Sequence, residues 1–319
     1  MVYSINAIHG GVTVAWKSSK MRHGVVAVCK VTENNYVKVI TNYFTFYKED
    51  FMKPTDITRK TIEDVVNHLY EATGASTFFE PPTVKIASAD DQWFTNFKTV
   101  IDPSHWTPQE ALNLLYPDAT AKSVISFVCP NSREAREGNR KETERPCELW
   151  ARIRSFGDQA LQNMRNQLAR WLQEHGVAAV APFQQDDYKL AVTNLRSRWS
   201  ERHVAFVAGM GTFGLSGGLI TEHGVAHRLA SVVTSLELPV DERPYGDDFT
   251  AWCTKCGACR HRCPAGSIGN TLAERDKTKC LEYQAKTVSS GRADTYGWMD
   301  LGIGCGLCQT AVPCENKRP

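Results

Sequence analysis

The cysteines of this chain are concentrated near one end, where eight of the eleven lie between Cys253 and Cys314. The run from Cys253 to Cys263 has the spacing C-x2-C-x2-C-x3-C and is followed by Pro264. This spacing is typical of thiolates that bind [4Fe–4S] clusters, and the fourth cysteine of such a run binds the other cluster in two-cluster proteins. Eight thiolates therefore predict two [4Fe–4S] clusters.

The same rule divides the thiols into two ligand sets. We expect the first set to be Cys253, Cys256, Cys259 and Cys314, and the second to be Cys263, Cys280, Cys305 and Cys308. Structural zinc is the alternative, because it also binds C-x2-C pairs, but it seldom uses this run. Disulfide frameworks are typical of short secreted chains. The other cysteines, Cys29, Cys129 and Cys147, are expected to be buried or spare.

Composition places the chain among globular proteins. It has 319 residues, 42% of them hydrophobic and 23% charged, which is enough for one large domain or two ordinary ones. A net charge of +2 gives no electrostatic reason to expect nucleic acid or an acidic membrane as a partner. No apolar run has the length of a membrane span, and the N-terminus lacks a signal sequence, so we expect a cytoplasmic protein with reduced thiols.

Three segments are expected to position the cysteines. Residues 1–80 predict a β-rich and helical extension, with β-branched runs at 12–16, 24–29 and 36–40 and a helical pattern at 56–72. Residues 81–245 are expected to form the core. Residues 246–319 are expected to form the domain that holds the clusters.

Within the core, helices and strands are expected to alternate, which indicates a layered fold of the α/β (α+β) class. The patterns predict strands at 83–87, 123–129 and 177–181, and helices at 107–115 and 158–175. The strand at 123–129 is apolar on both faces and is expected at the centre of a covered sheet. The strongly charged residues 131–147 are expected to form a solvated loop, with a functional lid as the alternative.

Five glycines lie within residues 209–218, where they allow close approach to a flat or large group. The alternative is a turn-rich connection between strands. Gly209–Gly214 has the letters of a dinucleotide fingerprint but follows an expected helix rather than a strand, which argues against that interpretation. Strands at 220–221 and 230–234 are expected in one sheet.

Two stretches resemble the family of epoxyqueuosine reductases and reductive dehalogenases. The segment AGMGTFGLSGGLIT at 208–221 leads through VVTSLEL into the cysteine run, and KCLEY and GCGLCQ carry the later thiols. The resemblance covers roughly residues 120–314. It implies a nitroreductase-like core that binds cobalamin, followed by a ferredoxin-like domain with two [4Fe–4S] clusters. The implied cobalamin contacts are Gly209, Gly211, Thr212, Phe213, Gly214, Ser216, Gly217 and Gly218.

The chain departs from the family pattern in three ways. Five residues separate Cys308 from Cys314, where the family usually has three followed by proline. The helical-repeat tail of epoxyqueuosine reductases is missing, which argues against tRNA as the substrate. The family's context for the proton donor is also absent. Asp158 is the nearest candidate, with a helix N-cap as the alternative, and Tyr188 is the second. His203, His223 and His227 are expected to be ordinary residues rather than ligands.

These observations predict a cobalamin-dependent iron–sulfur oxidoreductase that acts on a small molecule. Electrons would come from ferredoxin or flavodoxin, and a side-chain acid would donate a proton. The alternative is an electron-transfer protein without a substrate of its own, which would reduce the corrinoid of a partner protein.

Overall fold

The computed structural model describes the strands at residues 2–8, 11–17, 25–31 and 37–40, and residues 53–184, 197–288 and 304–319. The chain divides into two compact units, Met1–Met52 and Lys53–Pro319. The helix expected at 56–72 belongs to the second unit, so the boundary expected at residue 80 falls inside that unit.

The first unit contains a four-stranded antiparallel meander. β1 (Val2–Ile8) pairs with β2 (Gly11–Lys17), β2 with β3 (Val25–Val31), and β3 with β4 (Val37–Ile40). The β-branched runs predict β2, β3 and β4, and these strands are confirmed. β1 has no such run, because Ser4 and Asn6 interrupt it, and only its pairing with β2 identifies it as a strand.

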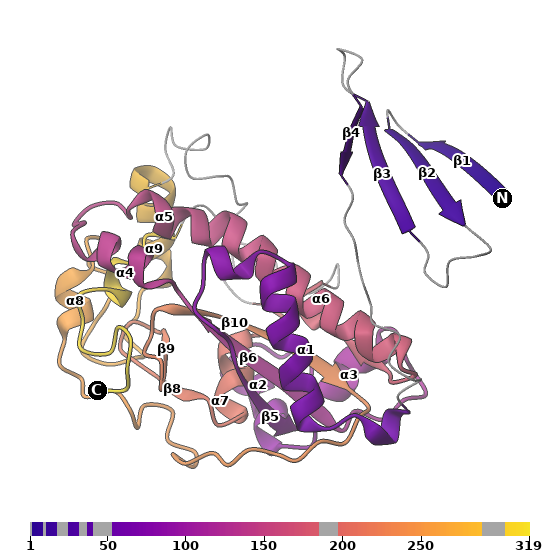
Figure 1. Ribbon diagram of the computed structural model, residues 1–319. Helices are drawn as coiled ribbons and strands as arrows, with labels where there is room; N and C mark the ends of the chain where they lie inside the picture. The colour runs from indigo at the N-terminus through magenta and orange to yellow at the C-terminus, as the bar shows by residue number, and fades with distance from the viewer. Residues whose placement is uncertain are drawn as a thin grey trace. The chain divides into compact units, whose positions relative to one another are not determined.

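A four-stranded antiparallel sheet with the order β5-β6-β10-β7 forms the centre of the second unit (Figure 1). The strands are β5 (Thr83–Ser88), β6 (Ser123–Pro130), β7 (Ala179–Val180) and β10 (His227–Thr234). Every residue of β6 is buried, as its apolar sequence predicts. The expected mixed class of helices and sheet is confirmed, and the antiparallel pairing makes this core α+β.

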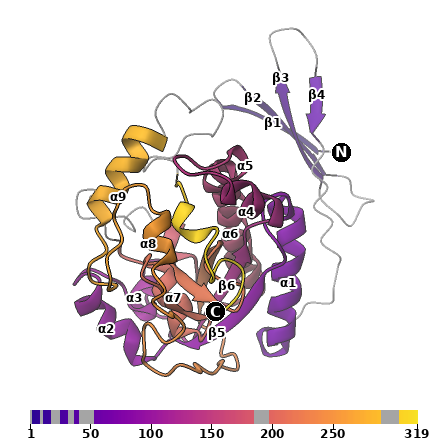
Figure 2. The same cartoon turned by 90° about the vertical axis from the view of Figure 1, so that its left-hand side faces the viewer.

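Helices cover both faces of this sheet (Figure 2). On one face, α6 (Asp158–Glu174) packs against β10, with α1 (Arg59–Ala72) beside it. On the other face lie α2 (Gln92–Val100), α3 (Pro108–Asn113) and α7 (Glu201–Val207). Large buried aromatic residues fill the space beneath α2 and α7, among them Phe94, Phe97, Trp199 and Phe206. The sheet therefore has a rigid, close-packed support for the segments that follow α7.

The charged segment at 131–147 contains a helix, so the prediction of a solvated loop is wrong. This helix, α4 (Arg133–Arg140), buries Arg136, whose side chain pairs with Glu80 at 2.8 Å. The partner carboxylate lies far away in the sequence, so the local charge pattern could not reveal that the segment is packed.

A separate antiparallel hairpin, β8 (Gly211–Phe213) and β9 (Leu219–Thr221), follows α7. The expectation that residues 220–221 share a sheet with 230–234 is therefore wrong. The remaining helices are α5 (Glu148–Arg152), α8 (Ala258–Arg262) and α9 (Lys277–Tyr283), the π-helical stretches Ile153–Gly157 and Gln284–Val288, and the 3-10 helices Pro54–Asp56, Ala75–Thr77, Pro182–Gln184 and Leu307–Gln309.

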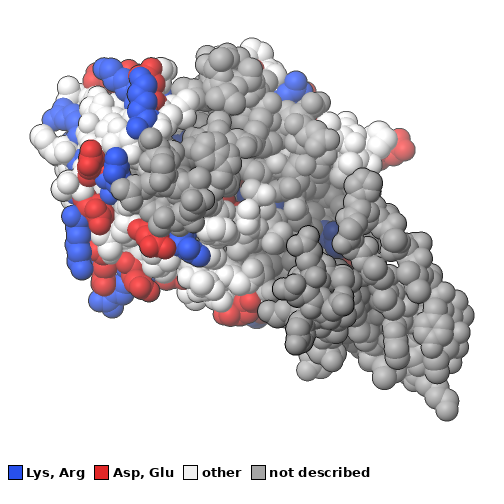
Figure 3. Space-filling view, turned by 90° about the horizontal axis from the view of Figure 1, so that it is seen from above, with Lys and Arg blue, Asp and Glu red and all other residues white. Residues whose placement is uncertain are grey.

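The surface carries both signs of charge. On the face in Figure 3, basic and acidic residues are interspersed, in keeping with the net charge of +2. Among the described helices, none is both long enough and apolar enough to cross a membrane.

Candidate functional site

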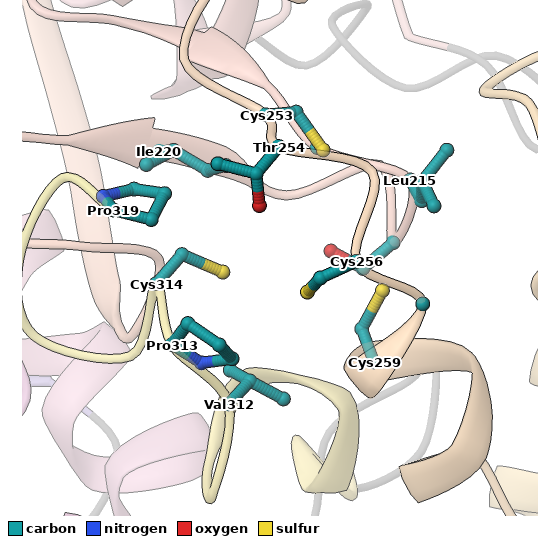
Figure 4. A pocket seen from close by; sticks show the side chains of 13 residues that line it. Leu215, Ile220, Cys253, Thr254, Cys256, Cys259, Val312, Pro313, Cys314 and Pro319 are labelled. Atoms are coloured by element: carbon teal, nitrogen blue, oxygen red, sulfur yellow. The ribbon is translucent and has the colours of Figure 1, made fainter.

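Four thiols from two distant segments line one small cavity. They belong to Cys253, Cys256, Cys259 and Cys314, and Figure 4 shows their sulfur atoms directed toward the shared space. Lys255 and Gly257 have φ values of 54° and 75°, in the left-handed region. The backbone therefore turns tightly, which lets the three thiols of the loop face one side.

The C-terminal tail brings Cys314 to the loop. Val225 N donates to the Cys314 carbonyl at 2.8 Å, so the tail is tied to the segment after the hairpin. Next to it, the carboxylate of Glu315 is 3% exposed and accepts hydrogen bonds from Arg140 at 2.9 Å and from Ala311 N at 2.8 Å. An ion pair between the buried Glu315 carboxylate and the half-exposed Arg140 of α4 therefore holds the end of the tail in place.

We expect Glu315→Gln to lower the free energy of unfolding by about 2 kcal/mol, because charge-assisted hydrogen bonds to Arg140 are lost in a buried site. Urea denaturation of the full chain measures this change. The matched control is Glu222→Gln, which removes an exposed carboxylate paired with Arg318 and should change stability by less than about 0.5 kcal/mol. Equal effects of the two substitutions would contradict the role assigned to Glu315.

The second set of thiols lies where three short helices meet. Cys263 ends α8, Cys280 lies in α9, and Cys305 and Cys308 lie at the 3-10 helix Leu307–Gln309. Two of the sulfur atoms already have polar partners: Gln284 Nε2 donates to Cys280 Sγ at 3.1 Å, and Ser267 Oγ lies 3.2 Å from Cys263 Sγ. Hydrogen bonds of this kind are among the factors that set the potential of an iron–sulfur cluster.

Electrostatic interactions separate the two sets. Burial, and next the neighbouring thiols of Cys259 and Cys253, raise the pKa of Cys314 to about 12. Burial, and next the thiols of Cys280 and Cys263, raise the pKa of Cys305 to about 11. Each thiol is thus perturbed by members of its own set, and binding of a metal group would release protons from both sets.

In a tetrahedral zinc site with bonds of about 2.3 Å, the sulfur atoms lie within about 4 Å of one another. In the part of the chain that the structure describes, no three His, Cys, Asp or Glu side chains lie close enough to hold one ion. Four thiols that face one shared space also match the number of thiolates that a [4Fe–4S] cluster takes.

A larger cavity, with a volume of about 320 Å³, lies beside the second set. Cys280, Cys305 and Cys308 form part of its wall, and residues from α7, β9 and β10 form the rest. Small residues are also present in the wall, namely Ser216, Gly218, Gly304 and Gly306. A ligand in this cavity would therefore contact the second set of thiols.

Glu201 is a carboxylate in the wall of this large cavity, at the first turn of α7. It accepts hydrogen bonds from Arg165 at 2.9 Å and from Ser231 Oγ at 2.5 Å. Burial raises the pKa of Glu201 from its ordinary value of 4.5 to about 7, although Arg165 opposes the shift. A carboxyl group that titrates near neutral pH in a cavity is a candidate for proton transfer.

The raised pKa of Glu201 predicts a pH dependence of stability. The folded state favours the protonated Glu201 carboxyl. The contribution of this group to the free energy of unfolding is therefore complete below pH 4.5 and is lost as the pH rises to about 7. Over that range we expect the wild-type chain to lose up to about 3 kcal/mol relative to Glu201→Gln, which has no charge to titrate. Denaturation of both chains at several pH values measures this. A constant difference between them would contradict the assignment.

Asp158 is buried and ion-paired on both sides. Its carboxylate contacts Arg154 and lies 3.0 Å from Arg228 Nε. The N-cap interpretation is wrong, because Gly157 before it has helical angles and the chain enters α6 from the π-helical stretch. Asp158 holds two arginines of the large cavity, and its role as proton donor stays a prediction. Tyr188 lies outside the described residues.

The glycine segment is divided between packing and cavity walls. A Cβ at Gly209 would lie 2.1 Å from the Glu242 carbonyl oxygen, and one at Gly211 would lie 2.1 Å from that of Ile220. These two glycines therefore permit close approach of backbone segments within the protein. Thr212 is fully buried, and its hydroxyl accepts a hydrogen bond from Trp252 N at 2.9 Å.

The rest of the segment lies nearer the cavities. Phe213 packs in the aromatic core, and Gly214 lines the first cavity. Ser216 lines both cavities, and Gly218 lines the large one. The Gly217 carbonyl accepts a hydrogen bond from Arg202. The prediction that these residues contact cobalamin therefore has its geometric support at Ser216 and Gly218.

The other candidate residues have local partners. His203 Nδ1 bonds to Ser200 Oγ at 2.7 Å, and His223 Nε2 bonds to Thr83 Oγ1 at 2.9 Å. His227 lines the large cavity, and burial lowers its pKa to about 4, so the ring is neutral. Cys129 is buried and Cys147 is half-buried, and neither lines a thiol cavity. The side chain of Cys29 lies outside the described residues.

The sequence patterns did not predict that four arginines line the large cavity. They are Arg154, Arg202, Arg228 and Arg275. Two of them flank the glycine segment, in α7 and β10, which are otherwise mostly apolar. A charge in such an element is the signal that could have drawn attention to them.

No protein-family model matches the chain, and no curated protein matches its sequence. The structure is similar to that of the catabolic reductive dehalogenase NpRdhA, with a TM-score of 0.51 and 16% identity over 86% of this chain and 34% of that one. A second structure, of a reductive dehalogenase described with B12-dependent dehalogenation, has a TM-score of 0.50, 16% identity and the same coverage. Epoxyqueuosine reductase from Bacillus subtilis has a TM-score of 0.45 and 19% identity over 81% of this chain and 67% of that one.

At these identities the similarity shows the fold alone. The described chain has the fold found in reductive dehalogenases, and it spans about a third of the length of those dehalogenase chains.

Proposed function

We propose that the chain is a reductase in which two [4Fe–4S] clusters carry electrons to a corrinoid, which reduces a small molecule. The observation that supports this most strongly is the position of the second thiol set in the wall of the large cavity. Electrons that reach this set can therefore pass directly to whatever the cavity holds.

The ligands of the clusters would be the two thiol sets. Cys253, Cys256, Cys259 and Cys314 surround a cavity that has thiols on several sides, and Cys263, Cys280, Cys305 and Cys308 form the second group. Bound iron converts such thiols to thiolates despite their raised pKa values. The fixed hydrogen bonds to Cys280 and Cys263 then tune the second cluster.

Exposure supports one direction of electron flow. Cys256 of the first set is exposed, whereas all four thiols of the second set are half-buried. A ferredoxin or flavodoxin would therefore deliver electrons at the first set. The second set would pass them to the cavity.

The residues of the large cavity could hold part of a corrinoid. The cavity has a volume of about 320 Å³, at the lower end for ligand pockets, so the rest of so large a group would extend beyond it. Parts of the wall are formed by residues with a small side chain or none, so a broad flat group can lie close to the backbone there. These residues are Ser216, Gly218 and Gly304. When bound, a corrinoid would supply a low-potential metal centre for reduction. The protein would hold it, exclude water and provide a proton from Asp158 or Glu201.

Cofactor binding tests this function. The full chain is reconstituted anaerobically with iron and sulfide, and cobalamin is added while the visible spectrum is recorded. We expect stoichiometric binding with a change in the spectrum. Clusters without any cobalamin binding would contradict the corrinoid reductase and leave an electron-transfer protein.

A further inference from the structure

The large cavity contains more positive than negative groups. Its wall includes Arg154, Arg202, Arg228 and Arg275. Glu201 is the carboxylate among the described residues of the wall, and its charge is matched by Arg165 at 2.9 Å. Positive charges in one cavity repel each other, and an anion bound among them offsets this repulsion.

Three of the four arginines have an anionic partner. Arg154 and Arg228 share the carboxylate of Asp158. Arg275 lies beside the thiols of the second set, which become thiolates when a cluster is bound.

The fourth arginine of the cavity wall is Arg202. It is exposed at the first turn of α7, and none of the described carboxylates lies within ion-pair distance of it. Arg275 and Arg228 lie close enough to repel its charge. One of its amino groups donates to the Gly217 carbonyl, which fixes the side chain in the wall.

We propose that Arg202 binds an oxyanion, a carboxylate or phosphate group, of the molecule that occupies this cavity. A guanidinium has five donors in one plane, so the hydrogen bond to Gly217 leaves others for an oxyanion. Arg228 and Arg275 add attraction from the same wall. The inference deepens the proposed function, because it names the chemical class of the ligand of that cavity.

Two sources could supply the oxyanion. A substrate could carry a carboxylate, or the corrinoid could carry it in the phosphodiester of its nucleotide. Both sources need the same donor, and two pairs of probes separate them. Benzoate and benzamide differ in charge but not in shape, and cobinamide lacks the phosphodiester that cobalamin has.

The test compares the reconstituted full chain with Arg202→Gln and Arg202→Lys. Arg260→Gln is the matched control, because it removes a guanidinium that bonds to Asn270 outside the cavity. Affinities for benzoate and benzamide are measured by calorimetry, and those for the corrinoids by their spectra. Iron content and thermal stability establish that each variant is folded.

We expect Arg202→Gln to weaken binding of one oxyanion-bearing probe, benzoate or cobalamin, about tenfold, as loss of a charge-assisted contact does. The counterpart that lacks the oxyanion, benzamide or cobinamide, should bind as before. A loss for benzoate indicates a substrate carboxylate, and a loss for cobalamin indicates the phosphodiester. Arg202→Lys should weaken binding of that probe less than Arg202→Gln, because lysine keeps the positive charge. Unchanged affinities for both benzoate and cobalamin in Arg202→Gln would overturn the inference. Absence of corrinoid binding by the wild type would contradict the proposed function instead, and the benzoate pair would still test Arg202.

Discussion

Replacement of Cys314 by alanine is expected to remove one cluster and to leave the other. Cys314 lines the cavity of the first thiol set, and the thiols that raise its pKa most, after burial, are Cys259 and Cys253 of the same set. Iron should therefore fall from about eight to about four atoms per chain. The remaining paramagnetic signal on reduction should come from the second cluster.

The reciprocal variant, Cys305→Ala, should lose the second cluster and keep the first. Cys147→Ala serves as the control, because this thiol bonds to the Ala135 carbonyl and belongs to neither set. It should retain about eight iron atoms. Loss of the same signal in Cys314→Ala and Cys305→Ala would contradict the division into two sets.

Arg275→Gln is expected to lower the reduction potential of the second cluster. The guanidinium is anchored on the carbonyls of Ser216 at 2.9 Å and Ser267 at 3.0 Å, and it lies beside Cys280 and Cys308. Reduction adds negative charge to a cluster, so a fixed cation favours the reduced state. We expect a decrease of about 60 mV, which is a tenfold change in a one-electron equilibrium.

A redox titration followed by electron paramagnetic resonance measures both clusters of this variant. The first cluster should keep its potential, because Arg275 perturbs thiols of the second set. Arg275→Lys should restore much of the potential, which a purely structural role would not require. A change in the reduction potential of both clusters, or of neither, would contradict the placement of Arg275 beside the second cluster alone.

The fold was predictable where a sequence pattern depends on local physics. β6 could be placed at the centre of a sheet because both of its faces are apolar, and α3 because Thr107 caps it and Pro108 starts it. The antiparallel sheet could not be inferred, since the order of helices and strands is compatible with either direction. α4 was missed because the partners of its buried charges lie elsewhere in the chain.

The candidate site was predictable only in part, for a similar reason. Thiol spacing is encoded within short loops and is visible in the sequence. The cavity beside the thiols is not, because Arg154 comes from a π-helical stretch, Arg228 from β10 and Arg275 from the segment before α9. Only the fold brings these residues together.

The iron and inorganic sulfide content of the full chain, purified without oxygen, tests the central claim most directly. We expect about eight atoms of each per chain, with two distinct clusters on reduction. Colourless protein that contains zinc, or neither iron nor sulfide, would contradict the account.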